Sequence, residues 1–145
     1  MNIIEGLQFE NLATEGSLII VDDQMNDCVK SSNIQEYFVK KVHHRSVSII
    51  FLCQNLFPQG KFGRDIRLNV HYIVIFKSPS LNSQVRFLGR QIFPNRPTFL
   101  PDAYKQATEL PFSYILVSLH PECNEALRVR TGILPNEQPF VFIPL

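Results

Sequence analysis

The sequence contains no tryptophan, only three cysteines among 145 residues and no long run of apolar residues. Cys28, Cys53 and Cys123 are widely spaced and odd in number, so they predict neither a disulfide framework nor a CxxC zinc site. No segment approaches the roughly 18 consecutive apolar residues of a transmembrane helix, and residues 1–15 lack the basic and apolar regions of a signal peptide. We therefore expect an intracellular protein, nuclear or cytoplasmic, that is neither secreted nor held in a membrane.

The chain also lacks an excess of charge, with 14 Lys and Arg residues against 13 Asp and Glu residues, but the charges are unevenly distributed. Residues 1–40 carry seven acidic and two basic side chains, whereas residues 41–110 carry ten basic and three acidic ones. A basic segment attracts polyphosphate or nucleic acid, because each bound phosphate releases counterions. The alternative interpretation is an ordinary solvated surface.

Short apolar runs alternate with amphipathic segments along the chain. The runs predict strands at 17–21, 46–53, 72–76 and 114–119, and the alternation at 127–130 predicts an exposed edge strand. Helices are expected from Ser32 or Asn33 to about residue 44, over 81–92, and from Pro101 to about residue 110. A loop containing Pro58, Gly60 and Gly63 is expected before the third strand, and Cys53 in its apolar run is expected to be buried.

Strands separated by helices indicate an α/β fold with a mainly parallel sheet flanked by helices, in which the continuous apolar runs are buried on both faces. Ligands bind such sheets at the carboxyl ends of the strands. Two strand ends carry polar groups suited to chemistry: Asp22 and Asp23 follow the first strand, and Gln54 with Asn55 follows the second. Carboxylates hold Mg²⁺, and an amide hydrogen-bonds a γ-phosphate or its attacking water. Polar residues directly after a strand are common in turns, so neither strand end alone is informative. The prediction of a nucleotide site depends on the two strand ends together.

Several stretches resemble the C-terminal half of DNA-packaging ATPases of the FtsK-HerA superfamily, especially those of poxvirus-like and adenovirus-like elements and of large self-synthesising transposons. The segments that carry the resemblance are LIIVDD, KVHHRSVSIIFLCQNLF, GKFGRDIRLNVHYIVIFKSP and SQVRFLGRQIFP, and the likeness extends from about Leu18 to Arg130. It implies a P-loop NTPase (RecA-like) core and a ring-forming motor that uses ATP and Mg²⁺ to move double-stranded DNA into a capsid.

The resemblance also implies roles for individual residues. Asp22 would bind Mg²⁺, Asp23 would take the place of the usual catalytic glutamate, and Gln54 would sense the γ-phosphate. Ring ATPases complete each site with an arginine from the neighbouring subunit. We favour Arg64 for this role over Arg67 and Arg86, although a surface arginine paired with Asp65 or solvent is the competing interpretation.

The sequence departs from the family pattern in two ways. Asp23 is one methylene shorter than the usual glutamate, and no GxxxxGK[ST] phosphate-binding loop is present, since only Gly60 precedes a lysine and Phe62 follows it. We therefore expect one partial ATPase domain over residues 1–145, with a lead-in at 1–16, core elements at 17–119 and an edge strand with a proline-rich tail at 120–145. We interpret the chain as the latter half of an ATPase that is either truncated or a degenerate copy. Its expected protein partners are further copies in a homo-oligomeric ring or the missing N-terminal ATPase half.

Two other functions remain open at this point. The first alternative is a non-catalytic oligomerisation or interaction module that is derived from such an ATPase. A metal-dependent nuclease using Asp22 and Asp23 lacks the additional acidic ligands of a two-metal site. His43, His44 and Arg45 suit the C-terminal end of a helix better than a metal site. Lys61 and the loop after Pro58 are candidates for contacts with a DNA backbone.

Overall fold

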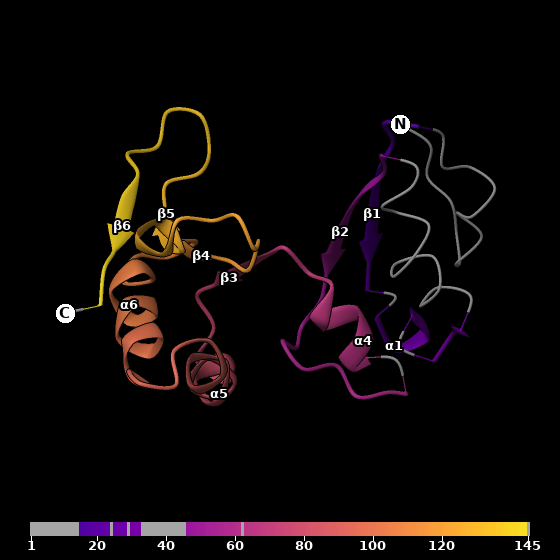
Figure 1. The fold of residues 1–145 in the computed structure, drawn as a ribbon, viewed down its shortest axis with the longest axis horizontal. Helices are drawn as coiled ribbons and strands as arrows, with labels where there is room; N and C mark the ends of the chain where they lie inside the picture. The colour runs from indigo at the N-terminus through magenta and orange to yellow at the C-terminus, as the bar shows by residue number, and fades with distance from the viewer. Residues whose placement is uncertain (1–14, 24, 29, 33–45, 62, 145) are drawn as a thin grey trace. The chain divides into compact units, whose positions relative to one another are not determined.

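The computed structural model describes residues 15–23, 25–28, 30–32, 46–61 and 63–144. These residues belong to two compact units, of which unit 1 spans Met1–Asn69 and unit 2 spans Val70–Leu145. Figure 1 shows the elements of both units along the chain. All the residues predicted to act at the nucleotide, Asp22, Asp23, Gln54 and Arg64, belong to unit 1.

Unit 1 is built on two parallel strands, β1 (Leu18–Asp22) and β2 (Ser48–Leu52), as the sequence predicted. Leu18 pairs with Ser48 and Asp22 pairs with Leu52, so the two strands end together. The prediction that both faces of these strands are buried is wrong. Val21 is buried, but Leu18 and Ile20 are each 56% exposed. A continuous apolar run fixes the strand but not which face is covered.

Among the described residues of unit 1, two short helices accompany the strands. Helix α1 (Met25–Cys28) follows β1. Helix α4 (Gly63–Leu68) lies where the sequence predicted only a loop. Its Ile66 is buried, and the Asn69 side chain donates a 2.8 Å hydrogen bond to the carbonyl of Asp65, which satisfies one terminal carbonyl of the helix. Apart from Ser32, the helix expected from Ser32 or Asn33 to about residue 44 lies outside the described residues, as do His43, His44 and Arg45.

Unit 2 contains a four-stranded sheet in the order β3-β4-β5-β6, and all of its strands are antiparallel. Strands β3 (Tyr72–Phe76) and β4 (Tyr114–Ser118) occur where they were predicted, but the mainly parallel sheet is a wrong prediction for this unit. The prediction assumed a single crossover helix between successive strands, which brings the chain back to the end of the sheet where the first strand began, so that the next strand runs parallel to it. Two helices connect β3 to β4, and β4 starts beside the end of β3, with Tyr114 paired to Phe76.

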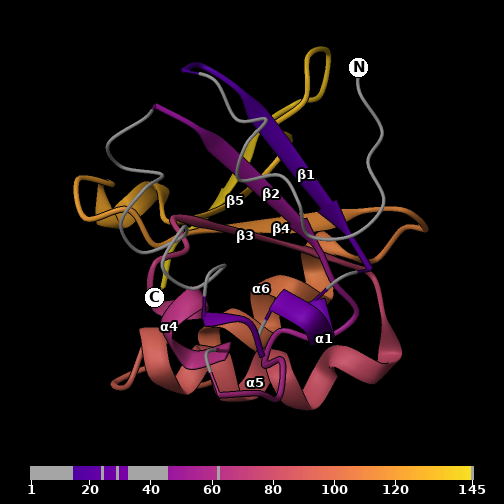
Figure 2. The same ribbon diagram turned by 90° about the vertical axis from the view of Figure 1, so that its right-hand side faces the viewer.

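Helices α5 (Asn82–Ile92) and α6 (Phe99–Ala107) pack against each other, and α6 contacts β4 and β5. Both helices lie on one side of the sheet (Figure 2). A short 3₁₀ turn, Pro79–Leu81, precedes α5. The core of the unit is apolar and its largest fully buried side chains include Ile75, Val85, Leu100, Ile115, Val117 and Val129. On β3, the alternate residues Tyr72, Val74 and Phe76 are exposed, so this strand has one covered face.

The prediction of an exposed edge strand at 127–130 is wrong, because the strand found there pairs on both sides. Strand β5 (Val129–Thr131), preceded by a 3₁₀ turn at Glu125–Leu127, pairs with β4 on one side and with β6 (Phe140–Phe142) on the other. The edge is therefore β6, and Val129 is buried. The loop between β5 and β6 is tied to the sheet by Tyr114, whose hydroxyl donates to Glu137 and accepts a 2.9 Å hydrogen bond from the Ile133 amide.

Candidate functional site

The carboxyl ends of β1 and β2 form one edge of unit 1, and the predicted site residues follow these ends. Asp22 is the last residue of β1 and pairs with Leu52, while Gln54 lies two residues beyond Leu52. Neighbouring strands are about 4.8 Å apart. The structure therefore brings the acidic pair and the amide to the same edge of the same two-stranded sheet. All three side chains belong to exposed residues, so a ligand can reach them.

The backbone turns sharply at Asp23, where φ is +52°. This left-handed conformation is uncommon for residues other than glycine, and Asp and Asn tolerate it better than most others. This turn ends β1 immediately after Asp22, so Asp22 has the extended backbone of a strand and Asp23 has left-handed backbone. Strained backbone of this kind persists where the surrounding structure enforces it, and it is frequent at ligand sites.

The donor set at this edge fits the protein part of a magnesium site. Mg²⁺ in phosphate-binding proteins takes one or two carboxylates and completes its octahedron with water and substrate phosphates. Asp22, the residue predicted to hold Mg²⁺, offers a hard carboxylate oxygen at this edge, and Asp23 places a second carboxylate beside it in sequence. Among the described residues there is no group of three or more His, Cys, Asp or Glu side chains placed to hold a metal ion.

The segment after β2 is held by a local hydrogen bond. The Cys53 thiol donates to the carbonyl of Asn55 at 3.3 Å, across Gln54. Cys53 itself is exposed, so the expectation of a buried thiol is wrong. The strand ends at Leu52, so the apolar run extends one residue beyond the end of the strand.

The three candidate arginines have different surroundings. The Arg67 guanidinium lies 4.8 Å from the centre of the Phe57 ring, a cation–π contact that keeps it within its own unit. Arg64 is on the first turn of α4 and is exposed. Arg86 is exposed on α5 and belongs to unit 2. Of the two arginines that follow Gln54 in unit 1, Arg64 is exposed, whereas Arg67 is half-buried.

Sequence reasoning missed the contact between Phe57 and Arg67 and the helix that positions Arg67. A signal for the helix was present in the sequence, because the segment Gly63–Leu68 lacks proline, contains glycine only at its first position and alternates in charge. Lys61, the residue proposed for DNA contact, is exposed in the segment before α4.

Comparison of the sequence with family models and with curated proteins, and of the structure with solved structures, finds no match. In the part of the chain that the structure describes, none of the helices has the length and apolar character needed to cross a membrane.

Proposed function

We propose that this chain supplies the metal side of a P-loop (RecA-like) ATPase site and forms the C-terminal part of a motor that moves double-stranded DNA. The observation that carries the proposal is the shared edge of β1 and β2, where Asp22, Asp23 and Gln54 follow paired strand ends. An aspartate that holds Mg²⁺ and an amide that orients the attacking water are recurring parts of P-loop NTPase sites, and this edge offers both groups.

Each residue has a separate role in this proposal. Asp22 would hold Mg²⁺, and Asp23 would orient and polarise the water that attacks the γ-phosphate. Gln54 donates a hydrogen bond to the γ-phosphate or to that water, and so distinguishes the triphosphate from the product. Mg²⁺, when bound, neutralises charge that develops on the phosphate oxygens. Arg64 reaches the phosphate of a neighbouring subunit in a ring and stabilises the same charge.

The phosphates also need a cradle of backbone amides, and the sequence contains no GxxxxGK[ST] loop to provide it. The proposal assigns that loop to a separate N-terminal half that joins the chain. Double-stranded DNA is the partner of the assembled motor, and the basic excess of residues 41–110 supports a contact with its phosphates.

Binding of a fluorescent ATP analogue in the presence of Mg²⁺ tests the proposal. The chain alone is expected to bind weakly, and a supplied N-terminal half that contains the phosphate-binding loop is expected to bring the affinity into the micromolar range. Asp22→Asn in this mixture should weaken Mg²⁺-dependent binding about tenfold or more. The matched control is Asp102→Asn, the same chemical change at an exposed residue of unit 2.

Three results would contradict the proposal. Micromolar binding by the chain alone would show that the site is complete without a separate loop. Equal binding by Asp22→Asn and the parent mixture would remove the metal role. The absence of binding in every mixture would remove the ATPase assignment altogether.

A further inference from the structure

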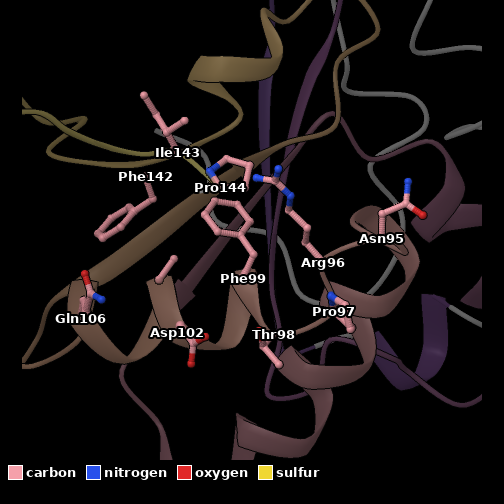
Figure 3. A pocket seen from close by; sticks show the side chains of 11 residues that line it. Asn95, Arg96, Pro97, Thr98, Phe99, Asp102, Gln106, Phe142, Ile143 and Pro144 are labelled. Carbon is pink, nitrogen blue, oxygen red and sulfur yellow. The ribbon is translucent and has the colours of Figure 1, made fainter.

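The sheet of unit 2 has two edges, and they differ in what they offer to another strand. Strand β6 is three residues long, and Phe142 and Pro144 at its end line an open hollow of about 510 Å³ together with Phe99 of α6 (Figure 3). Strand β3 is five residues long and contains neither proline nor a charged residue. Among the described residues, no strand pairs with β3 on the side away from β4. An unprotected apolar edge of this kind is a ready template for a further strand.

The hydrogen bonds between β3 and β4 determine which backbone groups of β3 are directed outward. The Leu119 amide donates a 2.7 Å hydrogen bond to the His71 carbonyl, and the Lys77 amide donates a 3.1 Å hydrogen bond to the Ser113 carbonyl. Both are pairs of directly opposite residues, and hydrogen-bonded pairs alternate with non-hydrogen-bonded pairs along an antiparallel ladder. The amide and carbonyl groups of residues 72, 74 and 76 therefore point away from β4.

The same three residues carry exposed side chains. Tyr72, Val74 and Phe76 are 54%, 40% and 58% exposed, while Ile75 between them is buried toward the helices. They lie on the face of the sheet opposite α5 and α6, which we name the open face (Figure 2). A strand added along β3 would place alternate side chains beside these three residues and remove apolar surface from water.

Most of the outward backbone groups are available to a further strand. The Phe76 carbonyl lies 3.0 Å from the Tyr104 hydroxyl, which donates either to it or to the Ser78 carbonyl. In the part of the chain that the structure describes, this leaves the amides of Tyr72, Val74 and Phe76 and the carbonyls of Tyr72 and Val74. These groups recur at every second residue, which is the spacing of a protein strand, so the edge fits a polypeptide.

The charge of this part of the chain indicates the chemistry of the partner. Residues 70–101, which include β3 and α5, contain no Asp or Glu but four basic residues, Lys77, Arg86, Arg90 and Arg96. Within the described residues, none of these four forms an ion pair with a carboxylate, and the Lys77 ammonium group donates its 2.7 Å hydrogen bond to the carbonyl of Glu109. A partner strand with acidic residues at its ends is therefore complementary in charge, which favours its encounter and its orientation.

We infer that the outer edge of β3 binds an extended acidic segment of a partner protein, which adds to the sheet as a further strand antiparallel to β3. The antiparallel direction follows the rest of the sheet, whose strand pairs are all antiparallel, because sheets of one direction are favoured over mixed ones. Main-chain hydrogen bonds supply the affinity of such a contact, and alternate side chains supply its specificity. All the residues involved belong to unit 2, so failure of this inference leaves the ATP-binding experiment unaffected.

Fluorescence anisotropy of a labelled peptide, EEVTVTVEE, titrated with the full chain in the absence of nucleotide, measures this contact. With its central valine opposite Val74, the antiparallel peptide places its three valine side chains on the open face and their amides toward β3. Its second glutamate is then opposite Lys77. We expect saturable binding with Kd below about 1 mM. The peptide KKVTVTVKK, with the opposite charge, should bind at least about tenfold more weakly.

N-methylated peptides test the hydrogen bonds without altering the protein. Methylation of the three valine amides removes the donors that face β3 and should weaken binding at least about tenfold. Methylation of the two threonine amides changes only the far edge of the added strand. It is the matched control, and it should change Kd by less than about twofold.

Two variants at one position test the protein side of the contact. Val74→Pro removes an outward amide and retains the ladder to β4, since proline is tolerated on edge strands where the N–H group faces outward. It should weaken peptide binding at least about fivefold. Val74→Thr keeps the amide and nearly the same shape, so it should bind like the parent chain. If Val74→Pro does not fold, the N-methylated peptides still decide the question.

Four results would overturn the inference. They are the absence of saturable binding by EEVTVTVEE, equal binding of the two N-methylated peptides, equal binding by a folded Val74→Pro variant and the parent chain, and tighter binding of the lysine-flanked peptide. Sedimentation velocity without peptide examines the other occupant of this edge. A dimer that Val74→Pro dissociates would assign the edge to a second copy of the chain, and this result also overturns the inference.

Discussion

The Tyr104 hydroxyl joins α6 to the end of β3, and its removal is expected to weaken unit 2 by a calculable amount. Tyr104 is only 5% exposed. Its oxygen accepts a 2.9 Å hydrogen bond from the Ser78 amide, and it lies 3.0 Å from the Phe76 carbonyl and 3.2 Å from that of Ser78. Its single proton serves one of these two carbonyls at a time.

Tyr104→Phe keeps the ring and removes two hydrogen bonds in a partly buried position. Each such bond contributes about 0.5–1.5 kcal/mol net, and an unpaired buried partner raises the cost of its loss. We expect the free energy of unfolding of unit 2 to fall by about 2 kcal/mol. At a typical slope of about 2 kcal/mol per molar urea, the midpoint then falls by roughly 1 M.

Hydrogen exchange of peptides from α6 and β3, measured across a urea series, reports on unit 2 by itself. This choice matters because the chain has no tryptophan to provide an intrinsic fluorescence signal. Tyr72→Phe is the control, since Tyr72 is 54% exposed and should change stability by less than about 0.5 kcal/mol. If Tyr104→Phe unfolds at the same urea concentration as the parent chain, the hydroxyl does not hold α6 to β3 and the reasoning is refuted.

Three further predictions concern backbone conformation and thiol chemistry. Gly132→Ala should destabilise unit 2 by about 2 kcal/mol or more, because φ of Gly132 is +69° and an added Cβ atom would lie 2.2 Å from the Gln138 carbonyl oxygen. Gly16→Ala should cost only about 1 kcal/mol, because φ of Gly16 is +76° but no atom lies within 4 Å of an added Cβ atom. Equal shifts in melting temperature for the two variants would contradict this account. Asp23→Val should destabilise unit 1 by about 1–2 kcal/mol, and Asp23→Gly should leave it at least as stable as the parent chain, with urea unfolding as the measurement and a reversed order as the contrary result. Burial, reinforced by the charge of Asp27, raises the pKa of the Cys28 thiol to about 11, so alkylation at pH 8 should modify Cys53 and Cys123 but not Cys28, and rapid labelling of Cys28 in the native protein would disprove its burial. Because the folded state favours the neutral thiol, this contribution to the free energy of unfolding should be fully present below pH 9 and lost as the pH rises to about 11.

Local patterns predicted much of the fold because they depend on neighbouring residues. The apolar runs located β1 to β4, and the spacing of Val85 and Leu88 located the buried face of α5. Strand direction in unit 2 could not be obtained this way, since it depends on how α5 and α6 pack in space. Strand β6 was missed although Phe140–Phe142 has strong strand formers, because the flanking prolines suggested an irregular tail.

The candidate site was predictable in part for a similar reason. Polar residues directly after two apolar runs must lie at strand ends, and parallel pairing then brings Asp22 and Gln54 to one edge. The left-handed turn at Asp23 and the stacking of Arg67 on Phe57 were not predictable, because neither leaves a mark in the spacing of residues. The exposure of Phe112, at 95%, was also not predictable, because an apolar residue between a proline and a strand gives no indication of whether it is buried.

The prolines beside β6 have a consequence for how unit 2 meets other molecules. Strand β6 is an edge of the sheet, and Pro139 and Pro144 stand just outside its ends at Phe140 and Phe142. Proline has no amide hydrogen, so a foreign strand laid along this edge would find only the four residues between Pro139 and Pro144 as a template. The β6 edge is therefore a poor template for backbone-mediated stacking, the route that leads to amyloid, whereas β3, the other edge of the sheet, contains no proline.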